Sequence, residues 1–203
     1  MERGECVMED KKQLIPIVAV TICSLLFFTA VIVIKGNYEF LLYLFVVLAL
    51  AIAVCIAQRR VHFPPFVLWH LVVWVTLHLA GGNLSFAGTK LYDVILYQFI
   101  DEPYHILRFD QVVHVYGFFA ATLASYYVLK PLLKKEHHAC ALFFIVILAG
   151  LGLGALNEIV EFPATLLVPR TGVGGYINNA LDLVADLLGA IIAMIYLWRR
   201  EQL

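Results

Sequence analysis

Six long apolar segments constrain the fold of this chain more than any other feature of its sequence. They cover residues 14–34, 38–57, 64–80, 110–129, 139–162 and 177–198. A helix needs about 20 apolar residues to cross a hydrocarbon core of about 30 Å. The segments therefore predict an all-α membrane protein, a bundle of six transmembrane helices in a single polytopic membrane domain over residues 1–203.

The composition agrees with this class. The chain is 63% hydrophobic and 14% charged, whereas soluble domains are about 45–50% apolar and about 25% charged. The net charge of -1 gives no reason to expect a nucleic-acid partner, so membrane lipids are the expected surroundings. The four cysteines are scattered without a C-x-x-C pair, which argues against a disulfide framework or a zinc–thiolate site. The first apolar segment is longer than the h-region of a secretory signal, and we expect it to be retained.

Basic residues predict the orientation in the plasma membrane. With six spans, both termini and the second and fourth connections share one side, which holds ten Lys and Arg residues against four on the other. The positive-inside rule then predicts that both termini are cytoplasmic, including the tail at residues 1–13. The ten residues are Arg3, Lys11, Lys12, Arg59, Arg60, Lys130, Lys134, Lys135, Arg199 and Arg200, and the four are Lys35, Lys90, Arg108 and Arg170.

The connection between the third and fourth segments, residues 81–109, is the longest in the chain. Its stretch at residues 91–100 mixes polar and apolar residues and is rich in aromatic ones. Because Tyr and Trp prefer the membrane–water interface, we expect an interfacial amphipathic segment between helices 3 and 4. Such a segment could act as a lid over a nearby site.

Three pairs of ionisable residues lie in or beside the apolar segments at helical spacing. The members of each pair are three or four residues apart and share one helix face. In the predicted topology all three pairs, together with His78 on the third segment, lie in the outer half of the membrane. Ionisable groups at that depth are costly and usually functional, so they predict a site. The pairs are Asp110 with His114, Glu158 with Glu161, and Asp182 with Asp186.

A metal centre is the sharpest interpretation of this convergence. Helical bundles hold divalent ions between carboxylates and imidazoles on facing helices, so the six paired residues are candidate ligands for one or two ions. The oxygen-rich set, with histidine and no thiolate, suits zinc, manganese or iron, and also magnesium. A bound ion would turn water into a nucleophile, as in a metal-dependent hydrolase. His78, as a further ligand or base, and Glu158 are the candidate catalytic residues.

Two other interpretations of the same residues are open. Intramembrane Asp, Glu and His chains also mark proton or cation pathways in transporters, although the inner half of each segment is almost wholly apolar. In a static polar network, Asp110 would pair with Arg108 and Glu158 with an asparagine amide. Asp182 would then favour the positive N-terminal end of its helix, but Asp186 lies too deep for that explanation.

The outer position of the cluster suggests a lipid or cell-envelope precursor as substrate, reaching the site from the bilayer or from outside. Arg108 and Arg170 lie on the same side and would anchor a phosphate group, although pairing with acidic neighbours or lipid headgroups is an equal alternative. We expect Asn178 and Asn179 to cap the sixth helix. We expect His70, nearer the membrane centre, to bond a backbone carbonyl.

The last three segments also resemble known families. They carry the motifs RFDQVVHVYGF at residues 108–118, NEIVEF at 157–162 and LDLVADLLGA at 181–190. With HLAGGN at residues 78–83 and LYD at 91–93, these resemble the uncharacterised YjdF-type inner-membrane family over about residues 70–192. More distantly, they resemble the VanZ-like proteins, which are associated with glycopeptide-antibiotic tolerance at the cell envelope. The resemblance implies a multi-pass membrane protein but no particular reaction. The chain departs from the first family at residues 174–179, GGYINN, where a Trp and further polar residues often stand.

Overall fold

The computed structural model describes residues 2–100, 104, 106–133, 138–168 and 171–202. Within these residues, six helices each contain a stretch long and apolar enough to cross a membrane, which confirms the predicted all-α fold with six spans. The helices are α1 (Glu2–Lys35), α2 (Tyr38–Val61), α3 (Pro65–Asn83), α4 (Phe109–Leu129), α5 (Ala139–Leu167) and α6 (Tyr176–Glu201).

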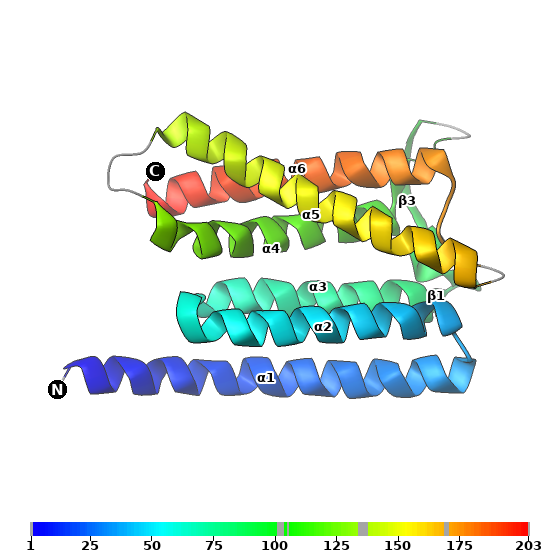
Figure 1. The fold of residues 1–203 in the computed structure, drawn as a ribbon. Coiled ribbons are helices and arrows are strands. Elements are labelled where there is room, and N and C mark those ends of the chain that lie inside the picture. Colours follow the sequence, from blue (N-terminus) through cyan, green and yellow to red (C-terminus); the bar gives the residue numbers. More distant parts are fainter. Residues whose placement is uncertain (1, 101–103, 105, 134–137, 169–170, 203) are drawn as a thin grey trace.

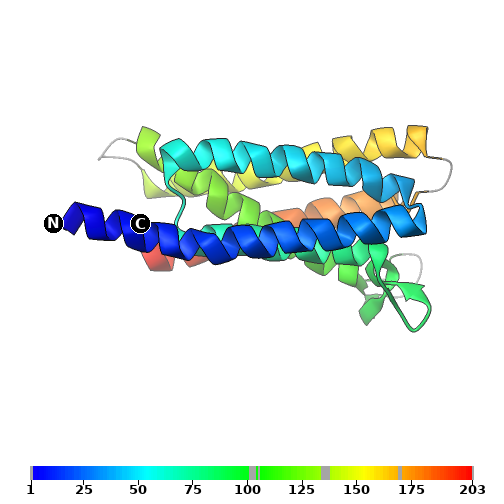
Figure 2. The same cartoon turned by 90° about the horizontal axis from the view of Figure 1, so that it is seen from below.

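The helices form two layers (Figure 1). One layer contains α1, α2 and α3, the other contains α4, α5 and α6, and α3 packs against α4 between them. α1 begins and α6 ends at one end of the bundle, as Figure 2 also shows. We call this the inner end, and the opposite end, with the α1–α2, α3–α4 and α5–α6 connections, the outer end.

Hydrogen bonds fix the outer end of the first layer. The side chain of Asn37 caps α2 by accepting a hydrogen bond from the backbone N–H of Phe40 at 3.3 Å. The Asn37 amide also donates to the backbone oxygen of Gly82 and to Oδ1 of Asn83 at the end of α3. Lys35 Nζ donates to the Asn83 carbonyl at 2.5 Å. The turn between α1 and α2 is therefore tied to the end of α3.

Short strands connect α3 to α4. β1 (Ser85–Phe86) pairs antiparallel with β2 (Thr89–Lys90), and a single 3-10 turn, η1 (Leu91–Asp93), follows. β3 (Ile95–Ile100) then pairs antiparallel with β4 (Ile106–Arg108). Every residue of β3 is exposed. The stretch expected to be interfacial is thus a turn and a strand that present apolar and aromatic side chains to their surroundings, as suits the membrane interface.

An apolar core fills the inner half of the bundle. Val67, Leu123, Val146 and Leu197, from α3, α4, α5 and α6, are each 0% exposed within it. A second apolar cluster packs α1, α2 and α3 together around Phe40. In the outer half of α4, α5 and α6, buried carboxylates and a buried histidine lie where such a core would otherwise continue.

Close contacts at two glycines set how the second layer packs. A Cβ at Gly189 would lie 2.2 Å from the backbone oxygen of Val115, so α6 touches the backbone of α4. A Cβ at Gly154 would lie 2.3 Å from Oδ2 of Asp186, so α5 lies directly against α6 at this level. Small residues allow such approaches between membrane helices. They bring the three helices together beside Asp186.

Candidate metal centre

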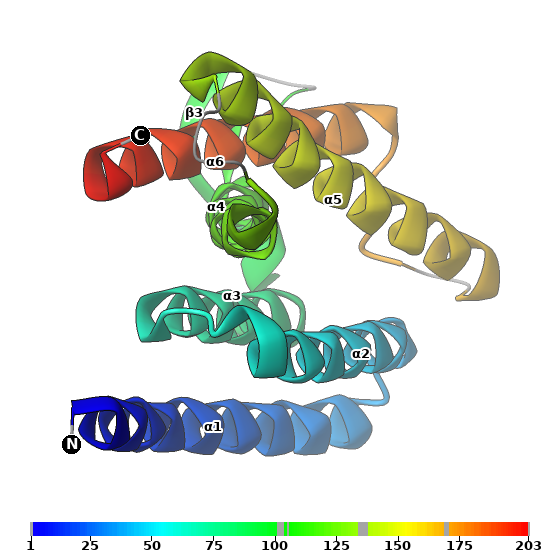
Figure 3. The same cartoon turned by 60° about the vertical axis from the view of Figure 1, so that its left-hand side comes forward.

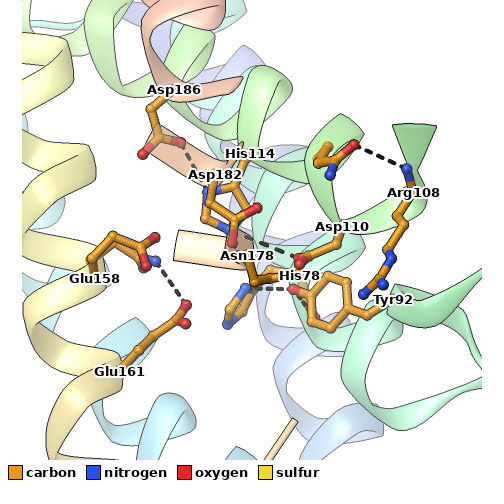
Figure 4. A network of polar contacts seen from close by, with 12 residues as sticks. His78, Tyr92, Arg108, Asp110, His114, Glu158, Glu161, Asn178, Asp182 and Asp186 are labelled. Carbon is orange, nitrogen blue, oxygen red and sulfur yellow. Dashed lines mark hydrogen bonds and ion pairs between the residues drawn. The ribbon is translucent and has the colours of Figure 1, made fainter. Parts of the chain in front are cut away.

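His114 of α4 lies at the centre of the buried polar cluster. Its Nδ1 lies 2.9 Å from Oδ1 of Asp186 on α6, and its Nε2 lies 3.8 Å from Oδ1 of Asp110, one turn earlier on α4. The histidine is 9% exposed and Asp186 is 0% exposed. Figure 4 shows the carboxylates of α4, α5 and α6 arranged around this imidazole.

Among the described residues, the cluster contains two overlapping groups of potential ligand atoms, each group lying within 4.8 Å. Asp110, His114 and Asp182 form the first, and His114, Glu158 and Asp186 form the second. A carboxylate bonded to one ring nitrogen is the usual way to orient a metal-binding histidine through its other nitrogen. The Asp186 contact with Nδ1 therefore favours the first group as the candidate ligand set, with Nε2 as the nitrogen donor.

Three buried carboxylates each keep one oxygen without a hydrogen-bond partner in the described part of the chain. These oxygens are Oε1 of Glu158, Oδ1 of Asp182 and Oδ2 of Asp186. Ionised oxygens within 4.8 Å of each other repel by at least about 3 kcal/mol at an effective dielectric constant of about 20. Burying the charges adds a further cost. The cluster therefore needs protons or a cation. Its oxygen-rich donors fit a divalent ion.

Asparagines of α6 hold the other oxygens of two of these carboxylates. Asn178 donates to Oδ2 of Asp182 at 2.5 Å, and Asn179 donates to Oε2 of Glu158 at 2.6 Å. We expected both asparagines to cap α6, but the N-cap is Gly175 and no side chain caps the helix there. The two amides lie inside the first turn, from which they reach the cluster instead.

The remaining predicted site residues lie at the edge of the cluster. Glu161 belongs to neither ligand group among the described residues, and its Oε1 accepts a hydrogen bond from Asn157 at 2.9 Å. Arg108 ends β4, immediately before α4, and Figure 4 shows it on the Asp110 side of the cluster. Arg170, the other predicted anchor, lies outside the described residues. His70 bonds the hydroxyl of Tyr116 at 2.7 Å rather than the expected backbone carbonyl.

The hydroxyl of Tyr92 contacts both the ring and the backbone of His78. It lies 2.8 Å from Nδ1 of His78 and donates to the His78 backbone oxygen at 3.0 Å. A phenol has one hydrogen, so with that hydrogen on the carbonyl its oxygen accepts from an Nδ1–H group. The pKa of Tyr92, outside the spans, is raised well above its usual range, chiefly by burial, so the phenol keeps its proton. With the phenol hydrogen on the carbonyl, a neutral His78 has its lone pair on Nε2.

His78 and His114 line the same small cavity, together with Trp74 and Asn157. Its volume is about 10 Å³, which is close to the space that one water requires. In the described part of the chain His78 is in neither ligand group. His78 therefore lies beside the ligand groups rather than within one of them.

Sequence reasoning paired Glu158 with an asparagine amide, as Asn179 confirms, but it missed the other polar residues that bond the carboxylates. Asn157 with Glu161, and Asn178 with Asp182, are four apart in the sequence, so a search for amide–carboxylate pairs at helical spacing could have found them. Tyr92 gives no such signal, because the residue that it bonds lies on another segment.

Comparison with known proteins supports the class assigned from the helices. An uncharacterized protein of Thermotoga maritima is 27% identical over 120 residues, which are 59% of this chain and 62% of that protein. The chain thus spans about three fifths of the length of this relative. No solved structure matches the chain. Residues 15–202, which include the whole cluster, match the family described as "Predicted membrane protein (DUF2238)", and the YjdF-type resemblance is consistent with this match. The chain belongs to this family of multi-pass membrane proteins.

Proposed function

We propose that the protein is a metal-dependent membrane enzyme, a hydrolase that acts on a lipid or cell-envelope substrate. The observation that supports this most is the pair of ligand groups around His114, combined with buried carboxylate oxygens that lack a partner among the described residues. One nitrogen and several carboxylate oxygens suit zinc, manganese or iron. A bound ion would supply Lewis-acid activation of a water.

In this proposal the residues of the cluster have different roles in holding the ion. Asp110, His114 and Asp182 would hold the ion, and Asp186 would orient His114 through its 2.9 Å hydrogen bond. If a second ion binds, Asp186 would share it with Glu158.

Two residues would move protons in this proposal. His78 would accept a proton at Nε2 because Tyr92 occupies Nδ1. Glu158 offers Oε1, which has no partner in the described part of the chain. Glu161 would add a carboxylate at the edge of the cluster. Arg108 would contact a phosphate group of the substrate.

The setting that we propose is the plasma membrane with both termini cytoplasmic. The ten-to-four distribution of Lys and Arg supports this orientation, which places the cluster and β3 toward the outer surface. The comparisons do not show a relation to VanZ-like proteins, and the envelope substrate rests on the position of the cluster in this orientation. Because a site within the membrane spans is surrounded by lipid, a lipid is the substrate class that we propose first.

Turnover of lipids in nanodiscs tests this proposal. The protein, loaded with zinc, manganese or iron in turn, is incubated with bacterial lipid extract, and lipids are followed by mass spectrometry. We expect one lipid class to be consumed, a chelator to stop its loss, and His78→Gln or Glu158→Gln to slow it by about 100-fold or more. Asp93→Asn, a change at an exposed acid of η1, should leave the rate unchanged.

Other outcomes would contradict the enzyme or favour a different function. A rate that is unchanged by the chelator and by Glu158→Gln would contradict the proposal. Proton or cation flux in proteoliposomes that Glu158→Gln abolishes would instead identify a transporter. Absence of both turnover and flux would leave a static polar network.

A further inference from the structure

A cleft of about 340 Å³ opens between α5 and α6 beside the carboxylate cluster. Ile159 and Phe162 at this cleft are each 62% exposed. Because both helices are membrane spans, the surroundings onto which the cleft opens are lipid. The cleft is lined by Ala155, Glu158, Ile159 and Phe162 of α5 and by Asn179 and Leu183 of α6.

The crossing of the two helices accounts for the position of this cleft. α5 runs obliquely across α6 (Figure 3), and the two touch where Gly154 lies against Asp186. Toward the outer end the helices separate, and larger residues such as Ile159 and Phe162 follow along α5. The close contact at Gly154 therefore produces the opening one turn beyond it.

The lining combines apolar walls with a polar floor. Ile159, Phe162 and Leu183 give the cleft apolar sides. Glu158 lies at the floor, is only 9% exposed, and has Oε1 without a partner among the described residues. Its Oε2 already accepts a hydrogen bond from Asn179. The floor is thus the carboxylate of Glu158, whose Oε1 is itself buried, beneath an apolar mouth.

We propose that this cleft binds a single membrane lipid whose head carries a primary amine, with the upper part of an acyl chain against Ile159 and Phe162. The amine would donate a hydrogen bond to the Glu158 carboxylate, and the surrounding carboxylates would favour its positive charge. A cleft of this volume lies near the lower end of the roughly 300–1,000 Å³ of small-molecule sites. The proposal rests on the proposed function, because it names the substrate class and its route from the bilayer to the metal centre.

Lipid selectivity measured by native mass spectrometry tests this proposal. The full chain is released from nanodiscs that hold equal amounts of phosphatidylethanolamine and phosphatidylcholine with identical acyl chains. The second head has no N–H group, so we expect the first lipid to be retained about tenfold over it, the difference that a charge-assisted hydrogen bond gives. Glu158→Gln should reduce this preference, because the acceptor loses its charge.

A matched pair of variants locates the lipid. Ala155→Phe fills the cleft and should lower the retention of phosphatidylethanolamine to that of phosphatidylcholine. Ala141→Phe makes the same change at another exposed position of α5, nearer the inner end, and should keep the wild-type preference. Ala155 is in neither ligand group among the described residues, so both variants should keep the metal content of the wild type.

The outcomes separate this proposal from the enzyme proposal. Equal retention of the two lipids, or a preference that Ala155→Phe does not change, would overturn the lipid site even if metal is bound. A dimer that Ala155→Phe dissociates would also overturn it, because the cleft would then hold a second copy of the chain. Selective lipid binding without any bound metal would support the lipid site and contradict the metal-dependent enzyme.

Discussion

The two ends of the second helix layer differ in how the oxygens of their carboxylates are paired. At the inner end, Glu201 of α6 accepts a hydrogen bond from the Tyr127 hydroxyl at 2.7 Å through Oε1 and one from Lys130 Nζ through Oε2. At the outer end, Glu158 has a partner for Oε2 but none for Oε1 in the described part of the chain. Both oxygens of Glu201 thus have a hydrogen-bond partner, whereas among the described residues only one of the two oxygens of Glu158 has one.

This difference separates a structural contact from a candidate site. A network that only stabilises the fold gives nearly every buried polar atom a partner. The α6 asparagines supply a donor to one oxygen of Asp182 and one of Glu158, and leave the second oxygen of each without one among the described residues. The outer cluster therefore has the incomplete pairing expected where a ligand or ion binds, and the inner end does not.

The largest loss of stability is expected at Gly189, where α6 touches the backbone of α4. Gly189→Ala should lower the free energy of unfolding by about 1–3 kcal/mol or more, because the new methyl group meets backbone atoms that cannot move aside. Gly152→Ala is the control, since a Cβ there meets nothing within 4 Å. Thermal unfolding in detergent measures both. Equal effects of the two changes would contradict the close packing that positions Asp186.

Neutralising one carboxylate at each end should change the stability of the fold in opposite directions. In metal-free protein at pH 8, Asp182→Asn should raise the free energy of unfolding by about 1–3 kcal/mol, because a buried charge with an unpartnered oxygen is removed. Glu201→Gln should lower it by about 1 kcal/mol or less, since a partly exposed ion pair is lost. Reversible unfolding measures both signs. A loss of stability in Asp182→Asn as large as in Glu201→Gln would indicate that the outer cluster is also structural.

Alkaline pH tests the contact between η1 and α3. Burial raises the pKa of Tyr92 in the fold, so its contribution to stability is complete below the unfolded pKa of about 10 and declines above it. Between pH 10 and 11 the wild type should lose up to about 1.4 kcal/mol more than Tyr92→Phe, in which this phenol is missing. Thermal unfolding of both proteins across this range measures the difference. Parallel curves would show that Tyr92 titrates normally.

The smallest expected effect is a change of tautomer without a change of fold. In ¹⁵N-histidine-labelled protein at neutral pH, His78 should show a protonated Nδ1 and an unprotonated Nε2. Tyr92→Phe removes the acceptor of the Nδ1–H group and should shift the ring toward the Nε2–H tautomer, while His114 keeps its wild-type signals. An Nε2–H tautomer of His78 already present in the wild type would contradict the assigned proton pattern.

The spans were predictable because apolar length alone decides whether a helix can cross a bilayer. The convergence of Asp110, His114, Asp182 and Asp186 followed from helical spacing combined with alternating helix direction. The spacing can be read from residues close together in the sequence, and the direction of each helix follows from the order of the spans. The strand character of residues 95–100 was not predictable in this way, because it depends on pairing with residues 106–108 across a connection.

The internal order of the cluster also could not be read from the sequence. Glu158 and Glu161 have the same chemistry, but only Glu158 joins a ligand group among the described residues, while Asn157 holds Glu161. The contact of Asn179 with Glu158 joins α6 to α5, and no periodicity indicates which side chains meet across two helices. Such contacts depend on the crossing of the helices at Gly154.

Metal content, compared between variants of the two ends, decides whether the outer cluster is a metal centre. Wild type, Asp182→Asn and Glu201→Gln would be purified in mild detergent without chelator, equilibrated with zinc or manganese, and subjected to elemental analysis. We predict about one or two ions per chain in the wild type and in Glu201→Gln, and a loss of most of this metal in Asp182→Asn. Wild-type protein without metal at every ion concentration, or an Asp182→Asn variant that is folded and fully loaded, would contradict a metal centre in the outer cluster.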